Sequence, residues 1–348
     1  MLDSLLSEAD LQKFRSLVDG AERIVVTCHV SPDGDAMGAV LAFSHYLWRK
    51  GKDAVPVVPN MYPDFLAWMP GTDKVRVYDK HEAETEPLIA AADLIVCLDF
   101  NSPDRLRMME AAVTASAAPK MMIDHHLEPA DFCVWVSSHP EMSATCELLY
   151  RIVTEADGLE AMTFEEAVCL YTGMMTDTGC FSYNSNRSEL YYIIARLLTK
   201  GIDKDKIYRN VFFNYPVDRF RLLGYMLYVK MTYMPEYHAS LMTLTREEQR
   251  RFSYRKGDTE GFVNVPLQIR KSRLSIFLRE DTERTNVVRV SLRSVDDFPC
   301  NRMAADFFNG GGHLNAAGGE LVCPMDEAVE VVRRALKRYM PLLTVKQK

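Results

Sequence analysis

The sequence predicts an α/β protein of two domains: an N-terminal domain with a doubly wound parallel sheet, a helical linker and a smaller C-terminal α/β domain. The chain has 348 residues, more than a single ordinary hydrophobic core accommodates. Before the linker, apolar runs of strand length alternate with helical segments, which is typical of a parallel sheet covered by helices. After Pro235 strand-like stretches predominate. We therefore expect domains at 1–200 and 236–348, with the linker at 201–235.

The N-terminal strands are predicted from short runs that are apolar throughout, as expected where both faces of a strand are buried. These runs are RIVVTCH (23–29), DAVPVVP (53–59), ADLIVCLD (92–99), PKMMIDHH (119–126) and FCVWVSS (132–138). Segments with helical spacing predict helices at roughly 4–18, 35–51, 103–115, 143–156, 163–179, 188–201 and 203–213.

The C-terminal domain is predicted to contain strands, a glycine cluster and a final helix. The strands are HASLMTLT (238–245), RLSIFLRED (273–281) and NVVRVSLRS (286–294). The glycine cluster NGGGHLNAAGG follows, and an amphipathic helix begins near Met325.

The net charge of the chain restricts the partners that it can bind. The net charge of −7 argues against a protein that coats long nucleic acid, long duplexes included. Residues 246–302 nevertheless contain 13 Lys and Arg against 9 Asp and Glu, so this stretch carries +4 and the remainder −11. An acidic first part and a locally basic second part suit metal binding in one and anion binding in the other.

The chain is expected to be cytoplasmic, without a membrane partner. No apolar run approaches the about 20 residues of a membrane span, and the N-terminus lacks the basic start of a signal peptide. The eight cysteines occur singly, several within apolar runs, which indicates reduced, buried thiols. The oligomeric state stays open, with a homodimer among the alternatives.

Potential metal ligands stand where the predicted N-terminal strands end. Ligand sites in open α/β sheets lie outside the carboxyl ends of the strands, so these side chains are expected to converge. A further carboxylate ends a predicted helix, in DTG. The residues are His29, Asp33, Asp35, Asp99, Asp124, His125, His126 and Asp177.

Each motif alone has a simpler explanation. A loop rich in Asp, Gly and Pro is usually a turn, and an Asp before a helix is usually a cap. Paired histidines are common on surfaces. All of these motifs in this order, at the ends of elements, are much harder to obtain by chance.

A divalent cation would remove the repulsion among clustered carboxylates. Mixed His and Asp ligands suit Mn²⁺, Zn²⁺ or Fe²⁺, and carboxylate-rich sets also suit Mg²⁺. One carboxylate can bridge two ions about 3.5–4 Å apart, the arrangement used in two-metal phosphoryl chemistry.

Together these residues resemble the DHH phosphoesterase superfamily. Its four N-terminal motifs match HVSPDGDAMGA, LDF, DHH and DTG in order, and GGGHLNAAGG resembles the glycine-rich motif of the DHHA1 domain. Length and the short linker make the chain most similar to the NrnA-type branch, the nanoRNases. The resemblance implies hydrolysis of short oligoribonucleotides and linear dinucleotides such as pGpG to nucleoside 5′-monophosphates. It also implies conversion of 3′-phosphoadenosine 5′-phosphate (pAp) to AMP.

The resemblance also implies a role for each residue. His29 and Asp33 would bind a first metal ion, Asp99 would bridge two ions, and His126 would face the substrate phosphate as a donor or an acid. Asp124 would orient its neighbours. Mn²⁺ is the expected cofactor, with Mg²⁺ as the alternative. The second ion would be bound by Asp35, His125 and Asp177.

The C-terminal domain is expected to bind the substrate. Successive backbone N–H groups in the run Gly310, Gly311 and Gly312 offer a nest for a phosphate, and His313 can donate to a phosphate or stack on a base. Arg293 and Arg279 stand at predicted strand ends and can hold a phosphate in bidentate fashion. The alternative explanations are a flexible glycine loop and solvated arginines.

Other functions remain as alternatives. Inorganic pyrophosphatases of this superfamily lack the GGGH motif, and RecJ-type exonucleases carry extra domains. Cyclic-dinucleotide phosphodiesterases usually carry membrane and sensory segments. A non-catalytic nucleotide sensor would be expected to have lost part of the ligand set, which is complete here.

Overall fold

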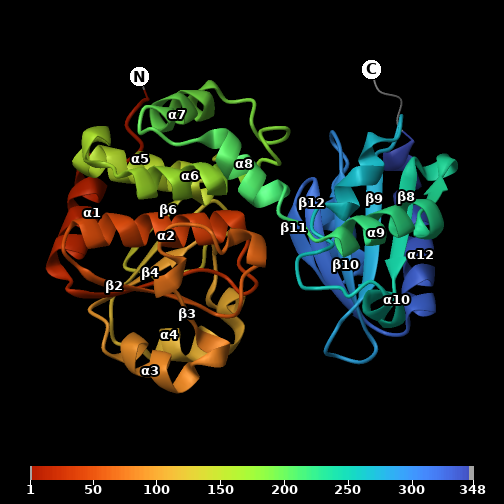
Figure 1. Cartoon of the computed structure of the whole chain (residues 1–348), viewed down its shortest axis with the longest axis horizontal. Coiled ribbons are helices and arrows are strands. Elements are labelled where there is room, and N and C mark those ends of the chain that lie inside the picture. The colour runs from red at the N-terminus through yellow and green to blue at the C-terminus, as the bar shows by residue number, and fades with distance from the viewer. Residues whose placement is uncertain (1, 345–348) are drawn as a thin grey trace. The chain divides into compact units, whose positions relative to one another are not determined.

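The computed structural model describes residues 2–344 and separates the chain into two compact units, Met1–Asn214 and Tyr215–Lys348. The boundary falls inside the segment 201–235 that the sequence suggested as a linker. Each unit has its own sheet and its own hydrophobic core (Figure 1).

The first unit contains a six-stranded parallel sheet in the order β3-β2-β1-β4-β5-β6. This is the doubly wound topology, so the predicted fold class of this domain is confirmed. Strand β3 is two residues long and was not predicted. The strands are β1 Arg23–Thr27, β2 Asp53–Val58, β3 Arg76–Val77, β4 Leu94–Leu98, β5 Lys120–Asp124 and β6 Trp135–Ser138.

Helices cover both faces of this sheet (Figure 1). Alternate residues of one strand face opposite layers: Ile24 and Val26 belong to one core cluster, and Val25 to the other. The helices of the larger layer are α1 Glu8–Gly20, α2 Gly34–Arg49, α5 Thr145–Asp157, α6 Phe164–Asp177, α7 Ser188–Leu198 and α8 Lys204–Phe212, and those of the smaller layer are α3 Glu82–Ala90 and α4 Glu110–Ala115.

The segment predicted as one helix at 103–115 is interrupted, so that prediction was wrong in detail. A 3₁₀ segment, η4, spans Pro103–Met109, and α4 begins only at Glu110. The cause is Arg107, whose φ of 52° and ψ of −115° are not helical. Leu106 and Met109, three residues apart, anchor η4 in the core.

The second unit contains a mixed six-stranded sheet in the order β11-β12-β10-β9-β8-β7. Helices α11 Cys300–Phe307 and α12 Met325–Leu343 share the main core cluster with β9, β10 and β12, while α9 Val217–Tyr225 contributes to a separate cluster. The predicted α/β class of this domain is therefore confirmed as well. The strands are β7 Thr232–Met234, β8 Ala239–Leu244, β9 Leu274–Glu280, β10 Val287–Ser294, β11 Gly311–His313 and β12 Ala316–Val322, and α10 spans Arg246–Arg251.

The glycine cluster forms a hairpin, β11–β12, and not a loop. A Cβ at Gly310 would lie 1.9 Å from the carbonyl oxygen of Gly318, and one at Gly312 would lie 2.5 Å from that of Ala316. The backbone N–H of Gly310 donates to Ala304. These glycines therefore allow close approach of the backbones. In an extended strand such as β11, successive backbone N–H groups point in alternate directions.

Within residues 2–344, no helix combines the length and the apolar character needed to cross a bilayer. All eight cysteines are free thiols.

Candidate metal centre

The candidate centre lies at the carboxyl edge of the first sheet, where β1 and β4 are neighbours. From these two central strands the chain proceeds in opposite directions, to β2 and β3 on one side and to β5 and β6 on the other. Such a switch point is where open α/β sheets bind ligands. His29 follows β1 and Asp99 follows β4 directly.

His29 and Asp33 come from the loop between β1 and α2. The Nδ1–H of His29 donates to the carbonyl of Val30 (2.9 Å), which leaves Nε2 as the nitrogen that faces the carboxylates. That Nε2 lies 3.4 Å from Asp99 and 3.9 Å from Asp33. One oxygen of Asp33 also caps α2 by accepting from Asp35 and Ala36, so the helix-cap explanation applies as well.

Asp35 is buried between α2 and the start of α5. It accepts hydrogen bonds from the backbone N–H groups of Thr145 (2.6 Å) and Cys146 (3.0 Å), the first residues of α5. The amino-terminal end of a helix favours negative charge, so this contact favours the ionised carboxylate and opposes the effect of burial on its pKa. Thr145 was not singled out from the sequence.

His125 and Asp177 complete a second group with Asp35. The Nδ1–H of His125 donates to the carbonyl of Met142 (3.3 Å), and its Nε2 lies 3.6 Å from both Asp99 and Asp177. Asp177 is the last residue of α6. The ligand atoms of Asp35, His125 and Asp177 lie within 4.8 Å of one another, as do those of His29, Asp33 and Asp99.

Asp99 stands between the two groups. Its Oδ2 faces His29 and its Oδ1 faces His125, and the Thr145 hydroxyl donates to Oδ1 (2.9 Å). The residue is 2% exposed and has a φ of 63°, in the left-handed region that non-glycine residues seldom occupy. Backbone strain of this kind concentrates at functional sites.

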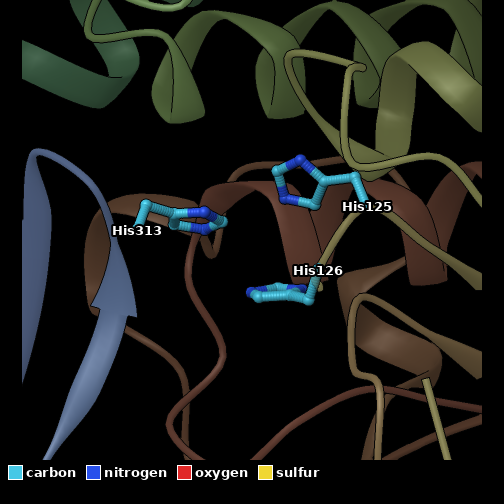
Figure 2. Close-up of side chains that lie close together, drawn as sticks. All are labelled: His125, His126 and His313. Carbon is cyan, nitrogen blue, oxygen red and sulfur yellow. The ribbon is translucent and has the colours of Figure 1, made fainter. Parts of the chain in front are cut away.

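His126 is oriented by Asp124. The Nδ1 of His126 lies 2.7 Å from Asp124, which also accepts the backbone N–H of His126. The rings of His125 and His126 lie edge to face, with an angle of 72° between their planes and centroids 4.9 Å apart; both side chains are drawn in Figure 2. Asp124 is fully buried and holds the imidazole, as expected of an orienting residue.

The charged groups in this cluster shift one another's pKa values. Burial would lower the pKa of His29 and of His125, but adjacent carboxylates raise both to about 9. Burial raises the pKa of Asp177 to about 7 and, together with the charges of Asp99 and Asp177, raises that of Asp35. Burial would also raise the pKa of Asp99, but His29, His126 and His125 hold it below its usual value. Such a cluster of perturbed groups is typical of a functional site.

Close helix packing sets the position of Asp35. A Cβ at Gly173 of α6 would lie 2.2 Å from the Cys146 sulfur and 2.8 Å from Asp35 Oδ1. A Cβ at Gly38 of α2 would lie 2.8 Å from the carbonyl of Cys169. Helices α2 and α6 can approach this closely because both positions are glycine.

In the second unit, Arg279 and Arg293 line one pocket together with Arg289 and Ser291. Arg289, Ser291 and Arg293 alternate along β10 and so share a face, a period-two signal that could have identified Arg289. Arg289 pairs with Asp281 and Glu320, and Arg279 lies over the Tyr254 ring. The Nη1–H of Arg293 donates to the backbone carbonyl of Leu292 (2.9 Å), and no ion pair of this arginine occurs among the described residues. His313 ends β11 (Figure 2).

Two family models match the chain: the N-terminal domain of the DHH family over residues 23–174 and the DHHA1 domain over residues 239–340. A crystal structure of an exopolyphosphatase-related protein from Bacteroides fragilis is 50% identical and superposes with a TM-score of 0.94, covering 99% of this chain and all of that one. The chain belongs to the DHH family. The resemblance inferred from the four motifs is thereby confirmed.

Two curated relatives have named activities. The bifunctional oligoribonuclease and PAP phosphatase NrnA of Thermus thermophilus is 29% identical, over 91% of this chain and 90% of that protein. The cyclic-di-AMP phosphodiesterase GdpP of Bacillus subtilis is 22% identical, over 93% of this chain but 49% of that protein. A RecJ exonuclease structure bound to manganese has a TM-score of 0.53 at 14% identity, covering 98% of this chain and 96% of that one, and shares the fold.

Proposed function

We propose that this protein is a metal-dependent phosphoesterase that hydrolyses short oligoribonucleotides and linear dinucleotides such as pGpG to nucleoside 5′-monophosphates, and pAp to AMP. The observation that carries this proposal is the buried carboxylate of Asp99 between two His/Asp groups. The substrate class is supported by the NrnA relative, whose similarity extends over both domains.

The donor set fits two divalent ions, Mn²⁺ before Mg²⁺. It offers two imidazole nitrogens and four carboxylates, a mixture that suits Mn²⁺. When bound, such ions lower the pKa of coordinated water and neutralise charge on the phosphoryl oxygens. In this proposal Asp99 serves both ions, His29 and Asp33 hold one, and the other is held by Asp35, His125 and Asp177.

The protein's own groups orient this set. The Nδ1–H donors of His29 and His125 each bond a backbone carbonyl and so present Nε2 to the centre. The Thr145 hydroxyl fixes one oxygen of Asp99. His126, held by Asp124, would donate a hydrogen bond to the substrate phosphate or a proton to the leaving oxygen.

Substrate length would be selected in the second unit. Arg293, Arg279, His313 and the glycines 310–312 are proposed to bind the terminal phosphate and base of a short substrate. Neither Arg293 nor Arg279 forms an ion pair with a carboxylate within residues 2–344, whereas Arg289 of the same pocket pairs with Asp281 and Glu320. A long polymer would gain little from so small a basic area on an acidic protein.

The test is a panel of substrates under one set of conditions. Initial rates are measured with Mn²⁺ and with chelator for pGpG, pAp, a cyclic dinucleotide, a 20-mer RNA and pyrophosphate. We expect rapid, chelator-sensitive conversion of pGpG to GMP and of pAp to AMP, with the other substrates slow. A cyclic dinucleotide that is hydrolysed faster than pGpG would move the assignment toward the GdpP type.

Polyphosphate is a second candidate substrate, because the 50% identical relative is titled exopolyphosphatase-related. Polyphosphate chains of defined length should therefore be added to the same panel of substrates. Faster release of phosphate from polyphosphate than of GMP from pGpG would replace the oligoribonuclease proposal.

A further inference from the structure

Helix α5 has no N-terminal cap of its own. Its N-cap residue is Ala144, whose side chain has no atom that accepts a hydrogen bond. The backbone N–H groups of Thr145 and Cys146 donate instead to the carboxylate of Asp35. The start of α5 therefore holds a candidate metal ligand, and the orientation of that ligand depends on where the helix begins.

A buried carboxylate fixes the start of this helix. Glu147 lies in the first turn of α5 and is fully buried. Its Oε2 accepts both the backbone N–H (2.8 Å) and the hydroxyl (2.7 Å) of Ser143. A glutamate three residues after an N-cap commonly reaches back to the chain that enters the helix. These bonds close the chain before α5 into a turn, and we call residues 142–147 the entry turn.

Arg187 supplies the positive charge beside Glu147. Its Nη1 lies 3.3 Å from the other carboxylate oxygen, Oε1, and donates to the carbonyl of Glu141 (2.8 Å). Within residues 2–344 no second cation forms an ion pair with Glu147. A buried carboxylate is costly to leave without a charged partner, so this pair ties the entry turn to the segment before α7.

The entry turn contacts one half of the candidate centre. The carbonyl of Met142, the first residue of the turn, accepts the Nδ1–H of His125. The Thr145 hydroxyl donates to Oδ1 of Asp99, the oxygen that faces His125. With the two N–H bonds to Asp35, the turn therefore contacts three of the groups around the proposed second ion.

The ligands proposed for the first ion are oriented by other groups. His29 donates to the carbonyl of Val30, and Asp33 accepts from the first turn of α2. In the part of the chain that the structure describes, neither side chain is hydrogen-bonded to the entry turn. A disturbance of this turn should therefore act on one ion and spare the other.

We infer that Glu147 and Arg187 are positioning residues for the second metal ion. Glu147 fixes the entry turn through Ser143, and Arg187 compensates the buried charge. The turn then orients Asp35 and His125 for the ion. The inference rests on the proposed function, because it assumes the two-ion centre. Removing a group that orients metal ligands typically lowers metal affinity about 10- to 100-fold.

The experiment measures Mn²⁺ binding to Glu147→Gln by calorimetry. Glutamine keeps an oxygen that can accept from Ser143, but it loses the attraction to Arg187, whose partly exposed side chain can turn to water. We expect one Mn²⁺ site weakened about 10- to 100-fold and the other within about twofold of wild type. The milder Ser143→Ala removes only the hydroxyl bond and should weaken the same site by a smaller factor, so it tests the inference even if Glu147→Gln does not fold.

Glu166→Gln is the matched control. Glu166 is also a buried carboxylate, 3.0 Å from Arg49, but it lies in the first turn of α6, at the opposite end of that helix from Asp177. Both substitutions should lower the Tm of the metal-free protein, because each breaks a buried ion pair. Only Glu147→Gln should weaken a Mn²⁺ site.

Two further backgrounds identify the ion. In His125→Asn, which removes a ligand of the second ion, adding Glu147→Gln should leave the affinity for the remaining ion within about twofold. In His29→Asn, which removes a ligand of the first ion, the same addition should lower the affinity for the remaining ion about tenfold or more. The reverse pattern would overturn the inference.

Other outcomes would overturn it as well. These are unchanged Mn²⁺ affinity in both Glu147→Gln and Ser143→Ala, an equal loss at both sites, or an equal loss in Glu166→Gln. Binding of fewer than two ions by the wild-type protein would also overturn it, whatever the activity. If the wild-type protein binds two ions but hydrolyses neither pGpG nor pAp, the proposed function fails while the binding results still decide the inference.

Discussion

Metal binding should release protons from His29 and His125. Both imidazoles have a pKa of about 9 in the metal-free protein, so at pH 7.5 nearly all molecules carry both protons. A metal ion binds only the neutral imidazole. Each proton displaced at pH 7.5 therefore costs about 2 kcal/mol, or about 30-fold in affinity. Because a larger fraction of each imidazole is neutral as the pH rises toward 9, the affinity for Mn²⁺ should increase with pH and then level off.

The magnitude can be measured by calorimetry. Mn²⁺ is titrated at pH 7.5 in two buffers of different ionisation enthalpy, and the difference in heat counts the protons released. We expect at least two protons for two ions, because Asp35, whose pKa is raised by burial, and Asp177, whose pKa of about 7 leaves it partly protonated, add to the two from the histidines. Between pH 7.5 and 8.5 the affinity for each ion should rise about eightfold.

Two variants make the result specific. His29→Asn should remove about one of the protons released. His81→Gln, which alters an exposed histidine at the start of α3, should leave the count unchanged. Release of less than about half a proton by the wild-type protein would refute the reasoning, because the carboxylates around Asp99 would then not hold the histidines in the charged form.

Three further predictions concern activity and stability. Asp99→Ala should lower kcat for pGpG by about 10³-fold or more, and near-normal turnover with both ions bound would refute its bridging role. Gly173→Ala should lower the free energy of unfolding by about 1–3 kcal/mol in denaturant titrations and reduce activity, because the added methyl meets Asp35 at 2.8 Å. The control Gly20→Ala, with nothing within 4 Å, should do neither. Arg293→Ala should raise KM for pGpG about tenfold without changing Mn²⁺ affinity, and a loss of metal would contradict this.

The candidate ligands could be predicted because the sequence changes from apolar to polar where each central strand ends. The run before Asp99 is apolar throughout, and the parallel topology brings its end beside that of β1. The order of motifs supplied the remaining ligands, including Asp177 at the end of α6.

The residues that orient these ligands could not be predicted in the same way. Thr145 contacts Asp35 and Asp99, which are far from it in the sequence, and no local pattern encodes such a contact. The interruption of the helix at Arg107 depends on a positive φ, which arginine adopts only when its surroundings impose it.

The glycine cluster shows how one residue type can support two explanations. The sequence suggested a phosphate nest, which stays a prediction, and the structure adds that the cluster forms a hairpin in which Gly310 and Gly312 prevent backbone clashes. Composition alone could not predict this close backbone approach.

The most direct test of the two-ion centre is anomalous diffraction from crystals of the Mn²⁺-loaded protein. We expect two manganese peaks about 3.5–4 Å apart, both within bonding distance of Asp99. One peak should contact His29 and the other His125. A single peak, or two peaks that do not share Asp99, would contradict a two-ion centre bridged by Asp99.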